Sequence, residues 1–338
     1  MKQLASPIKK VISFNVLLII FTLAAFAPFA ARGQAAQKSA DILLADPTVF
    51  FEKGVYYLYG TVEGDANLGF KGYSSKDMKS WKPIRANDGY ALRNGESFGT
   101  ANFWAPQIFR NNKQFLMAYA ANENIAIAAA ISPLGRFTQK KNLALPAPVK
   151  QIDPFVFIDE DGKKYLYHVR LTNGNRIFVA EMTDDFSNIK PETLRECITA
   201  TEAWENTSNA AWPVAEGPSI VKRKGSYYLF YTANDFRNPD YAVGYATASS
   251  PLGPWKKYEG NPIISKKNVG VNGPGHGDFF TDNAGSLNYV FHTHQSQTKV
   301  TPRKTAMIRV NFSADASGAP DKVIADENTF VYLKAIVE

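Results

Sequence analysis

Residues 153–169 read DPFVFIDEDGKKYLYHV, and it is this pattern that decides the fold. A small or acidic turn leads into an apolar strand, and a short polar turn then leads into an aromatic-rich strand. Four more copies of the pattern read DPTVFFEKGVYYLYGT from Asp46, APQIFRNNKQFLMAYAA from Ala105, EGPSIVKRKGSYYLFYTA from Glu216 and GHGDFFTDNAGSLNYVFHTH from Gly275. The copies begin about 50 to 60 residues apart, which leaves room for about four short strands each and is typical of β-propeller blades. The sequence therefore predicts an all-β fold, a five-bladed β-propeller.

Strand signals dominate the rest of the chain after residue 40. Runs such as YYLFYTA at 227–233 alternate aromatic, β-branched and small residues, which suits a pleated, half-buried surface. A second element of turn residues followed by an apolar residue comes after the strand pairs at 74–83, 132–139, 183–191 and 250–257. This element is consistent with a hairpin that leads to the outer strand of a blade, with its aromatic residues packed between blades.

Carboxylates begin three of the five copies, at Asp46, Asp153 and Glu216. The same position of every propeller blade faces one central pocket, so we expect these distant acids to converge. A single Asp-Pro turn is common in proteins. Three clustered carboxylates, however, would repel one another and raise one another's pKa values. Such a cluster suits acid–base catalysis.

The first 35 residues differ from the repeats. Lysines at the start precede an apolar run from Val11 to Ala27, and a stretch of small residues follows. This order is typical of a secretory signal peptide, so we interpret residues 1–35 as a leader and residues 36–338 as the propeller domain. The alternative is a membrane anchor, because the run is near the lower length limit for a span. We predict export to the periplasm or the cell exterior.

Charge and cysteine content exclude several classes of function. The net charge of +7 comes from 38 basic and 31 acidic residues, and removing residues 1–35 takes away four basic residues and no acid, which leaves +3. No basic cluster with interleaved aromatic residues indicates nucleic-acid binding, and no protein partner is implied. Cys197 is the single cysteine, which excludes disulfides within the chain and structural cysteine-based metal sites.

The motifs together resemble glycoside hydrolase family 43, whose members are five-bladed β-propellers. The resemblance runs from Asp46 to about Phe312 and rests, in order, on ADPTVF, WAPQI, IDPFVFIDEDGKKYL, EGPSIVKRKGSYYLFYTA, YAVGYATASSPLGPW and GPGHGDF. It implies that Asp46 is the general base and Glu216 the general acid. Asp153 would be the third acid, which sets the pKa and orientation of the general acid.

Further site residues follow from the same resemblance. His276 in GPGHG matches a histidine near the propeller axis that contacts a central water or a metal ion such as Ca²⁺, and no other cofactor is implied. Arg303 matches an arginine that reaches the sugar beside the general acid, and Trp104 matches an aromatic residue of the innermost subsite. Gln107 departs from the family, which often has an acidic residue after WAP.

The activity implied by the resemblance is inverting hydrolysis of plant-type polysaccharides or oligosaccharides, most often at α-L-arabinofuranosides or β-D-xylosides. Inversion implies a separation of roughly 6.5–9.5 Å between the carboxyl groups of base and acid. Glu216 must hold a proton near neutral pH. Burial and the charge of Asp153 would raise its pKa, and Arg303 would oppose them if it is close.

Two other functions compete with this one. A retaining enzyme of the sucrose and fructan group would need Arg-Asp-Pro, but Ile152 precedes Asp153. A carbohydrate-binding propeller without catalysis would repeat nearly identical sites, whereas these repeats have diverged. The sugar, the linkage and exo or endo action depend on the loops at 86–103, 199–215 and 234–240.

The remaining histidines have a simpler interpretation. His292 and His294 lie two apart on a predicted strand and share a face, so they could form a metal pair. Otherwise they are polar strand residues, as is His168.

Overall fold

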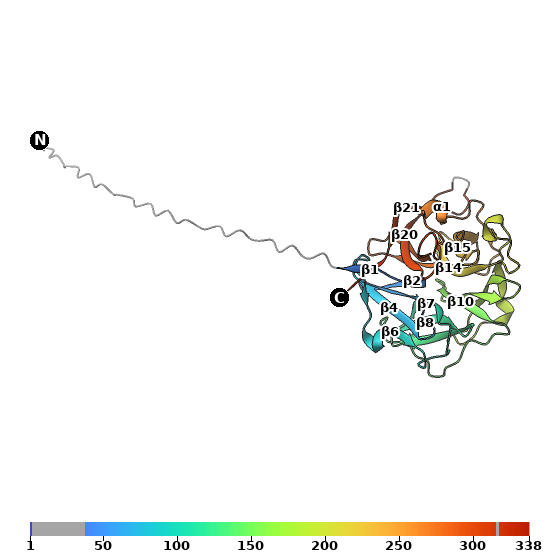
Figure 1. Ribbon diagram of the computed structural model, residues 1–338, viewed down its shortest axis with the longest axis horizontal. Helices are drawn as coiled ribbons and strands as arrows, with labels where there is room; N and C mark the ends of the chain where they lie inside the picture. Colours follow the sequence, from blue (N-terminus) through green and yellow to red (C-terminus); the bar gives the residue numbers. More distant parts are fainter. Residues whose placement is uncertain (2–37, 316–317, 338) are drawn as a thin grey trace. The chain divides into compact units, whose positions relative to one another are not determined.

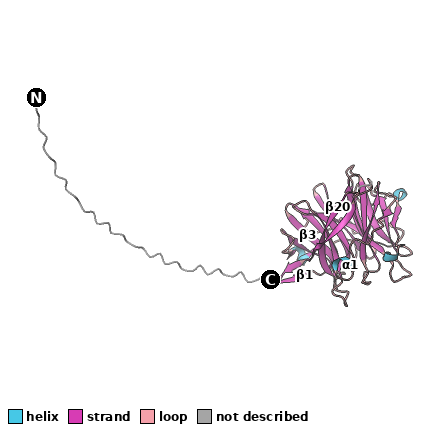
Figure 2. Ribbon diagram, turned by 90° about the horizontal axis from the view of Figure 1, so that it is seen from above, coloured by secondary structure: helices cyan, strands magenta, loops and turns pink. Residues whose placement is uncertain are grey.

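The computed structural model describes residue 1, residues 38–315 and residues 318–337 (Figure 1). Almost all of the predicted leader lies outside the described residues, so the leader stays a prediction. Within the described part of the chain, no helix is long and apolar enough to cross a membrane. Strands make up most of the ordered structure, with a few very short helices, as Figure 2 shows.

Five antiparallel sheets are arranged around a common centre, and each is one blade (Figure 1). Blade 1 contains β2 (Leu44–Glu52), β3 (Val55–Val62), β4 (Gly69–Ser75) and β5 (Lys82–Pro83), with β6 (Tyr90–Arg93) beside β4. Blade 2 contains β7 (Trp104–Asn111), β8 (Gln114–Ala121) and β9 (Asn124–Ala130). Blade 3 contains β10 (Gln151–Ile158), β11 (Lys164–Leu171), β12 (Asn175–Glu181) and β13 (Arg195–Ile198).

The last two blades follow the same order from inner to outer strand. Blade 4 contains β14 (Ala215–Arg223), β15 (Ser226–Ala233), β16 (Ala242–Ala248) and β17 (Lys256–Lys257). Blade 5 contains β18 (Gly275–Thr281), β19 (Leu287–Thr293), β20 (Lys304–Ser313) and β21 (Lys322–Tyr332). The helical segments are Ala86–Gly89, Pro191–Thr193 and Ala203–Glu205, all 3₁₀, and α1 (Lys266–Val269). The five-bladed fold is thus confirmed.

Blade 2 differs from the expected four strands. Beyond β9 the sheet continues only as an isolated bridge between Ala129 and Thr138. The chain then passes through Pro146 and Pro148, and proline has no N–H to donate to a strand ladder. In contrast, the segment at 86–103, expected to be irregular, supplies β6 as an extra strand of blade 1.

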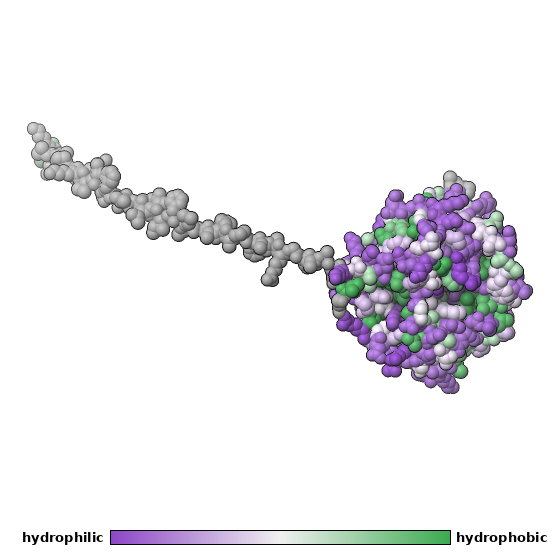
Figure 3. All heavy atoms as spheres, viewed as in Figure 1, coloured by the Kyte–Doolittle hydropathy of each residue, from purple (hydrophilic) through white to green (hydrophobic). Residues whose placement is uncertain are grey.

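Aromatic side chains fill the space between blades, as the sequence indicated. Phe70 of blade 1 meets Phe103 and Tyr119 of blade 2 edge to face, with ring centroids 5.9 and 5.7 Å apart. All three side chains are fully buried. On the face shown in Figure 3 the surface is mainly hydrophilic, with hydrophobic residues scattered over it. Burial of aromatic surface between blades therefore supplies the core.

A bulge interrupts the inner strand of every blade at the same point. The pairing register shifts directly after Ala45, Trp104, Ile152, Glu216 and Gly275. The next residue in each blade has a left-handed backbone, with φ of 48° at Asp46, 46° at Ala105, 52° at Asp153, 59° at Gly217 and 46° at His276. For residues other than glycine this conformation costs about 1–2 kcal/mol. Four of the five blades therefore carry this local strain near the axis, and Gly217 avoids it in blade 4.

The two ends of the described propeller close the ring. β1 (Ser39–Asp41) pairs with β22 (Lys334–Ile336), and the Ile42 N–H donates to the Leu333 carbonyl at 2.9 Å. Thr305 of blade 5 is fully buried, and its hydroxyl accepts from the Leu44 N–H of blade 1 at 3.2 Å and donates to the Leu44 carbonyl at 2.8 Å. One side chain thus satisfies two buried backbone groups across the closing junction.

Replacing Thr305 with Val should destabilise this junction. Valine has the same shape but leaves both polar groups of Leu44 without a partner, at a cost of about 1–3 kcal/mol for each group. We expect the free energy of unfolding in urea to fall by about 2–4 kcal/mol.

Thr329 offers a matched control for this measurement. Its hydroxyl likewise accepts from an N–H, that of Arg309, and donates to a carbonyl, that of Asp326, but it is only partly buried and lies at the irregularity of the outer strand β21. Water can replace those bonds, so Thr329→Val should cost less than about 1 kcal/mol. Equal losses for the two variants would contradict the role given to Thr305.

Candidate active site

The bulges explain how residues from different blades meet at the axis. Glu216 pairs with Thr232 immediately before its bulge, as Ala45 pairs with Thr61 in blade 1. The residue of blade 4 that corresponds to Asp46 is therefore Gly217. The expectation that all three acids occupy the same position of their blades is wrong for Glu216, which lies one residue earlier. Two residues of each bulge oppose one residue of the partner strand, so neighbouring positions can both approach the pocket.

Glycine at position 217 has a physical reason. Its φ is +59°, and a Cβ atom there would lie 2.9 Å from ring atoms of His276. A side chain would therefore displace the histidine that lies between the acids. Gly217 also lets its N–H approach Asp153, whose Oδ2 accepts from it at 3.2 Å.

Hydrogen bonds from the bulges join neighbouring blades around the axis. The Asp46 N–H donates to His292 Nδ1 (3.1 Å), and the Ala105 N–H donates to Thr61 Oγ1 (3.0 Å). The Gly217 N–H donates to Asp153 Oδ2 (3.2 Å), and the His276 N–H donates to Thr232 Oγ1 (2.8 Å). In each case the acceptor belongs to the preceding blade. These bonds fix the positions of the site residues relative to one another.

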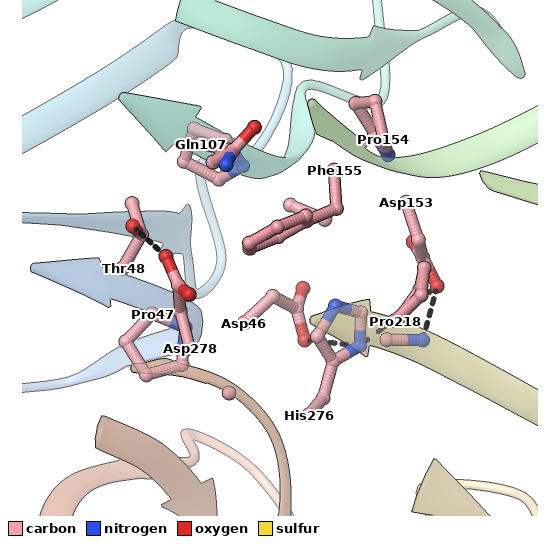
Figure 4. Close-up of a pocket in the computed structure, with 14 residues that line it drawn as sticks. Asp46, Pro47, Thr48, Gln107, Asp153, Pro154, Phe155, Pro218, His276 and Asp278 are labelled. Atoms are coloured by element: carbon pink, nitrogen blue, oxygen red, sulfur yellow. Dashed lines mark hydrogen bonds and ion pairs between the residues drawn. The ribbon is translucent and has the colours of Figure 1, made fainter. Parts of the chain in front are cut away.

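Asp46 is buried and surrounded by donors. Its Oδ2 accepts from the Thr61 hydroxyl at 2.6 Å, and its Oδ1 lies 3.3 Å from Arg303 Nη1. Oδ1 also lies 3.4 Å from His276 Nδ1 (Figure 4). Burial raises the pKa of Asp46, but the charges of His276 and Arg303 and the contact with His292 outweigh it and hold the pKa well below its usual value. Asp46 is therefore ionised at neutral pH.

Arg303 lies on the Asp46 side of the pocket. Its Nε also donates to Glu63, and its guanidinium lies over the Phe236 ring at 4.5 Å from the centroid. Its close ionic contacts are thus with Asp46 and Glu63. Its charge therefore favours the ionised form of Asp46, and its reach toward the sugar beside the general acid stays a prediction.

Glu216 has a different environment from Asp46. Its Oε1 accepts from the Tyr241 hydroxyl at 2.7 Å, and its Oε2 accepts from the Asn175 amide at 2.9 Å. Burial and, next, the negative charge of Asp153 raise the pKa of Glu216 to about 7. The pKa of Asp153 is itself raised, by burial first, against the opposing charge of His276. One carboxyl of the pocket can therefore hold a proton near neutral pH while another is ionised.

His276 lies between Asp46 and Asp153 (Figure 4). Its Nδ1 is 3.4 Å from Asp46 Oδ1 and 3.9 Å from Asp153 Oδ2. Burial lowers the pKa of His276, but the carboxylates of Asp46, Asp153 and Glu216 outweigh it and raise the pKa. When it carries a proton, the imidazole offsets the repulsion among the acids.

A cavity of about 30 Å³ lies on the axis against these residues, and Gln107 and Asp278 also line it (Figure 4). Calcium takes 6–8 oxygen ligands. Here Gln107 Oε1 already accepts from the Val156 N–H at 2.7 Å, and Asp278 Oδ2 accepts from the Thr48 hydroxyl at 2.6 Å. No group of three or more His, Cys, Asp or Glu among the described residues is arranged to hold a metal. The cavity fits a water, which needs about 10–15 Å³, better than a calcium ion.

Gln107, where the family often has an acidic residue, makes two hydrogen bonds to the backbone of Val156. Besides accepting from Val156, its amide nitrogen donates to the Val156 carbonyl at 3.1 Å. An ionised acid could not make this second bond. Gln107 therefore joins blades 2 and 3 with both of its polar atoms.

Trp104 holds the register position in blade 2 that Glu216 holds in blade 4, directly before the bulge. Its side chain is partly exposed. This position suits an aromatic wall of the pocket, as the resemblance implied.

His292 is a residue of the site, a position that its sequence context did not predict. It lies against Asp46 and stacks on Tyr241, with ring centroids 5.6 Å apart. His294 instead meets the Phe236 carbonyl through Nε2 at 2.8 Å, so the two histidines do not form a pair. His168 is a buried strand residue whose pKa burial lowers to about 3.

Several other residues of the site were missed. Thr61 and His292 both lie opposite the position before a bulge, so the hairpin pairing of the repeats could have indicated them. Asn175 belongs to no repeated motif, and it reaches Glu216 from the neighbouring blade 3. Tyr241 begins the run YAVGYATASSPLGPW and reaches Glu216 from within blade 4.

Comparison with known proteins agrees with this chemistry. The family model for glycosyl hydrolases family 43 matches residues 41–317. The crystal structure of an endo-1,4-beta-xylanase from Bacteroides thetaiotaomicron superposes with a TM-score of 0.81 at 39% identity, covering 89% of this chain and 100% of that one.

Two curated relatives are more distant. A beta-D-galactofuranosidase of Aspergillus niger is 24% identical over 80% of this chain and 79% of its own length. An extracellular exo-alpha-(1->5)-L-arabinofuranosidase of Streptomyces avermitilis is 23% identical over 64% of this chain, which spans about half (49%) of that relative. The family match and the solved xylanase structure together cover nearly the whole propeller, and the chain therefore belongs to glycosyl hydrolase family 43 and is a glycosidase.

Proposed function

We propose that this enzyme cleaves α-L-arabinofuranoside or β-D-xyloside linkages with inversion, using Asp46 as general base and Glu216 as general acid. The observation that carries the proposal is the contrast between the two carboxyls. Asp46 has a pKa well below its usual value, and Glu216 has a pKa of about 7. Glycosidic hydrolysis by inversion needs one ionised and one protonated carboxyl on opposite faces of the sugar.

Each residue around the pair has a role in this reaction. Glu216 gives its proton to the leaving oxygen, while Asp46 takes a proton from the water that attacks the anomeric carbon. His276 and Arg303 keep Asp46 ionised, and Asp153 keeps Glu216 protonated through its negative charge. Binding without catalysis does not account for two carboxyls whose pKa values are moved apart in this way.

The substrate class and the location rest on other observations. The solved structure at 39% identity is described as a xylanase, and one relative is described as an extracellular arabinofuranosidase, which supports xylan- or arabinan-type substrates. The basic, apolar and small-residue order of the first 35 residues supports export. No cofactor takes part in the proposed reaction, and we propose that the axial cavity holds water.

The first test concerns the proton on Glu216. Because the acid must be protonated, kcat/KM should fall as the pH rises through about 7, the pKa of Glu216, and should persist on the acid side because Asp46 stays ionised. Asp153→Asn removes a negative charge that raises this pKa, so the alkaline limb should move to lower pH. Asp161→Asn, at an exposed hairpin of the same blade, is the control and should leave the limb in place. An unmoved limb in Asp153→Asn would contradict the role given to Asp153.

The second test separates acid from base. A 4-nitrophenyl glycoside has an activated leaving group, so Glu216→Gln should harm oligosaccharide cleavage about 10²–10⁴-fold and the activated substrate far less. Asp46→Asn should harm both substrates alike, and azide should rescue it more readily because a small anion replaces the activated water. Rates are measured on arabinofuranosides, xylosides and galactofuranosides, and NMR gives the configuration of the first-formed product.

Three results of this test would count against the proposal. Equal losses for both variants on both substrates would refute the assignment of roles. A product of retained configuration would refute inversion, and activity confined to galactofuranosides would refute the substrate class.

The third test concerns the axial cavity. Dialysis against EDTA should leave both kcat and the melting temperature unchanged, because His276 supplies the positive charge between the acids. Metal analysis of the purified enzyme by mass spectrometry accompanies the measurement. Loss of activity on chelation that calcium restores would show that the cavity holds the ion.

A further inference from the structure

An exposed tryptophan is connected to Glu216 through one side chain. The Trp212 indole Nε1–H donates to Asn175 Oδ1 at 2.9 Å, and Asn175 Nδ2 donates to Glu216 Oε2 at 2.9 Å. Trp212 is 49% exposed, although most large aromatic residues of the described chain are buried. A large, partly wet aromatic side chain beside a carboxyl pocket is unusual unless it contacts a ligand.

The indole settles the orientation of the amide. An indole N–H can only donate a hydrogen bond, so the amide oxygen of Asn175 must face Trp212. The amide nitrogen then necessarily faces Glu216, where it can only donate. Oε2 of Glu216 is therefore held as an acceptor along this direction, and the carboxyl proton must point elsewhere.

The loop that carries Trp212 is anchored on both sides. Toward blade 3, the Asn175 N–H donates to the Pro213 carbonyl at 2.9 Å. Toward blade 4, the fully buried Glu205 accepts from the Tyr231 hydroxyl at 2.6 Å and from Lys257 Nζ at 2.6 Å. These anchors hold the indole in a fixed place beside the acid, so the exposed ring does not result from a loosely held segment.

We propose that Trp212 is the platform on which the leaving-group sugar stacks, and that its indole N–H, through Asn175, positions the Glu216 carboxyl for proton transfer. Trp212 thus binds the sugar beyond the scissile bond, and Asn175 is a positioning residue. The inference rests on the proposed role of Glu216 as general acid. Sugar rings present apolar C–H faces that pack on aromatic rings, so occupancy of the platform brings the glycosidic oxygen to the acid.

Two variants separate the platform from the hydrogen bond. Trp212→Phe keeps an aromatic ring but has no N–H, whereas Trp212→Ala removes both. The substrates are the oligosaccharide that the parent enzyme cleaves and the glycosyl fluoride of the same sugar, which has no leaving-group ring and needs little protonation. Since Trp212 is exposed, both variants are expected to fold, and their melting temperatures are measured alongside the rates.

The platform predicts effects on KM. Trp212→Ala should raise KM for the oligosaccharide about tenfold, because the stacking contact with the sugar ring is lost. The KM for the fluoride should stay within about twofold of the parent, since one hydrogen bond at most is involved. Trp212→Phe should keep the parent KM for both substrates. A parent-like oligosaccharide KM in Trp212→Ala would overturn the platform.

The hydrogen bond predicts effects on pH dependence. Donation from Asn175 favours the ionised form of Glu216, so its loss should raise the pKa of the acid and move the alkaline limb to higher pH. Trp212→Phe and Asn175→Ala should show this shift with a kcat loss of about three- to tenfold on the oligosaccharide, and the double variant should add nothing. Unmoved limbs in both single variants would overturn the positioning role.

The same experiment distinguishes this inference from the proposal that Glu216 is the general acid. Glu216→Gln is measured in parallel on the oligosaccharide and the fluoride. If it loses only oligosaccharide cleavage while the Trp212 and Asn175 variants resemble the parent, the general acid stands and the inference is wrong. If Glu216→Gln loses both activities equally, the proposed function itself fails.

Discussion

The left-handed bulge at the start of each inner strand is the constraint on which the site depends. At this point each blade turns a residue toward the axis and directs its N–H toward the preceding blade. Four of these N–H groups find side-chain acceptors there, which are His292, Thr61, Asp153 and Thr232. The strain of about 1–2 kcal/mol at a residue other than glycine is offset by buried hydrogen bonds. The same geometry that joins the blades therefore creates the pocket.

Asp and Glu carboxyls have similar pKa values in water, but the charges and burial within this pocket move the pKa values of Asp46 and Glu216 apart. Asp46 lies beside the positive charges of His276 and Arg303, which lower its pKa, so it loses its proton readily. Glu216 is buried and lies near the negative charge of Asp153, and both raise its pKa to about 7, so it retains its proton up to about that pH. Because His276 contacts both aspartates, its charge limits the repulsion that would otherwise oppose folding around the cluster. The arrangement resembles the general pattern of paired acids whose environments move their pKa values apart.

Loops supply what the repeated blades do not. The loop at 199–215 belongs to no repeat, yet the contacts of buried Glu205 and the bond from Asn175 to Pro213 attach it to blades 3 and 4. Phe236 of the loop at 234–240 lies over Arg303, and its carbonyl meets His294. Variation in these loops can change the sugar that is recognised while the axial acids stay in place.

The repeat, the strand pairs within each blade and the approach of Asp46, Asp153 and Glu216 to one pocket could be predicted from sequence, because hairpins and Asp-Pro turns are local and leave a local pattern. The sequence also indicated Trp104 and His276 through motifs next to those turns. The register of Glu216 was misjudged because a bulge changes which residue faces inward without changing the composition of the strand. Only the tertiary structure decided that Arg303 accompanies Asp46 and that Tyr241, Asn175 and His292 surround the acids. The contacts of Arg303, Asn175 and His292 join different blades, whereas Tyr241 reaches Glu216 within blade 4. The pKa of each carboxyl depends on charges and burial that no local stretch of sequence contains.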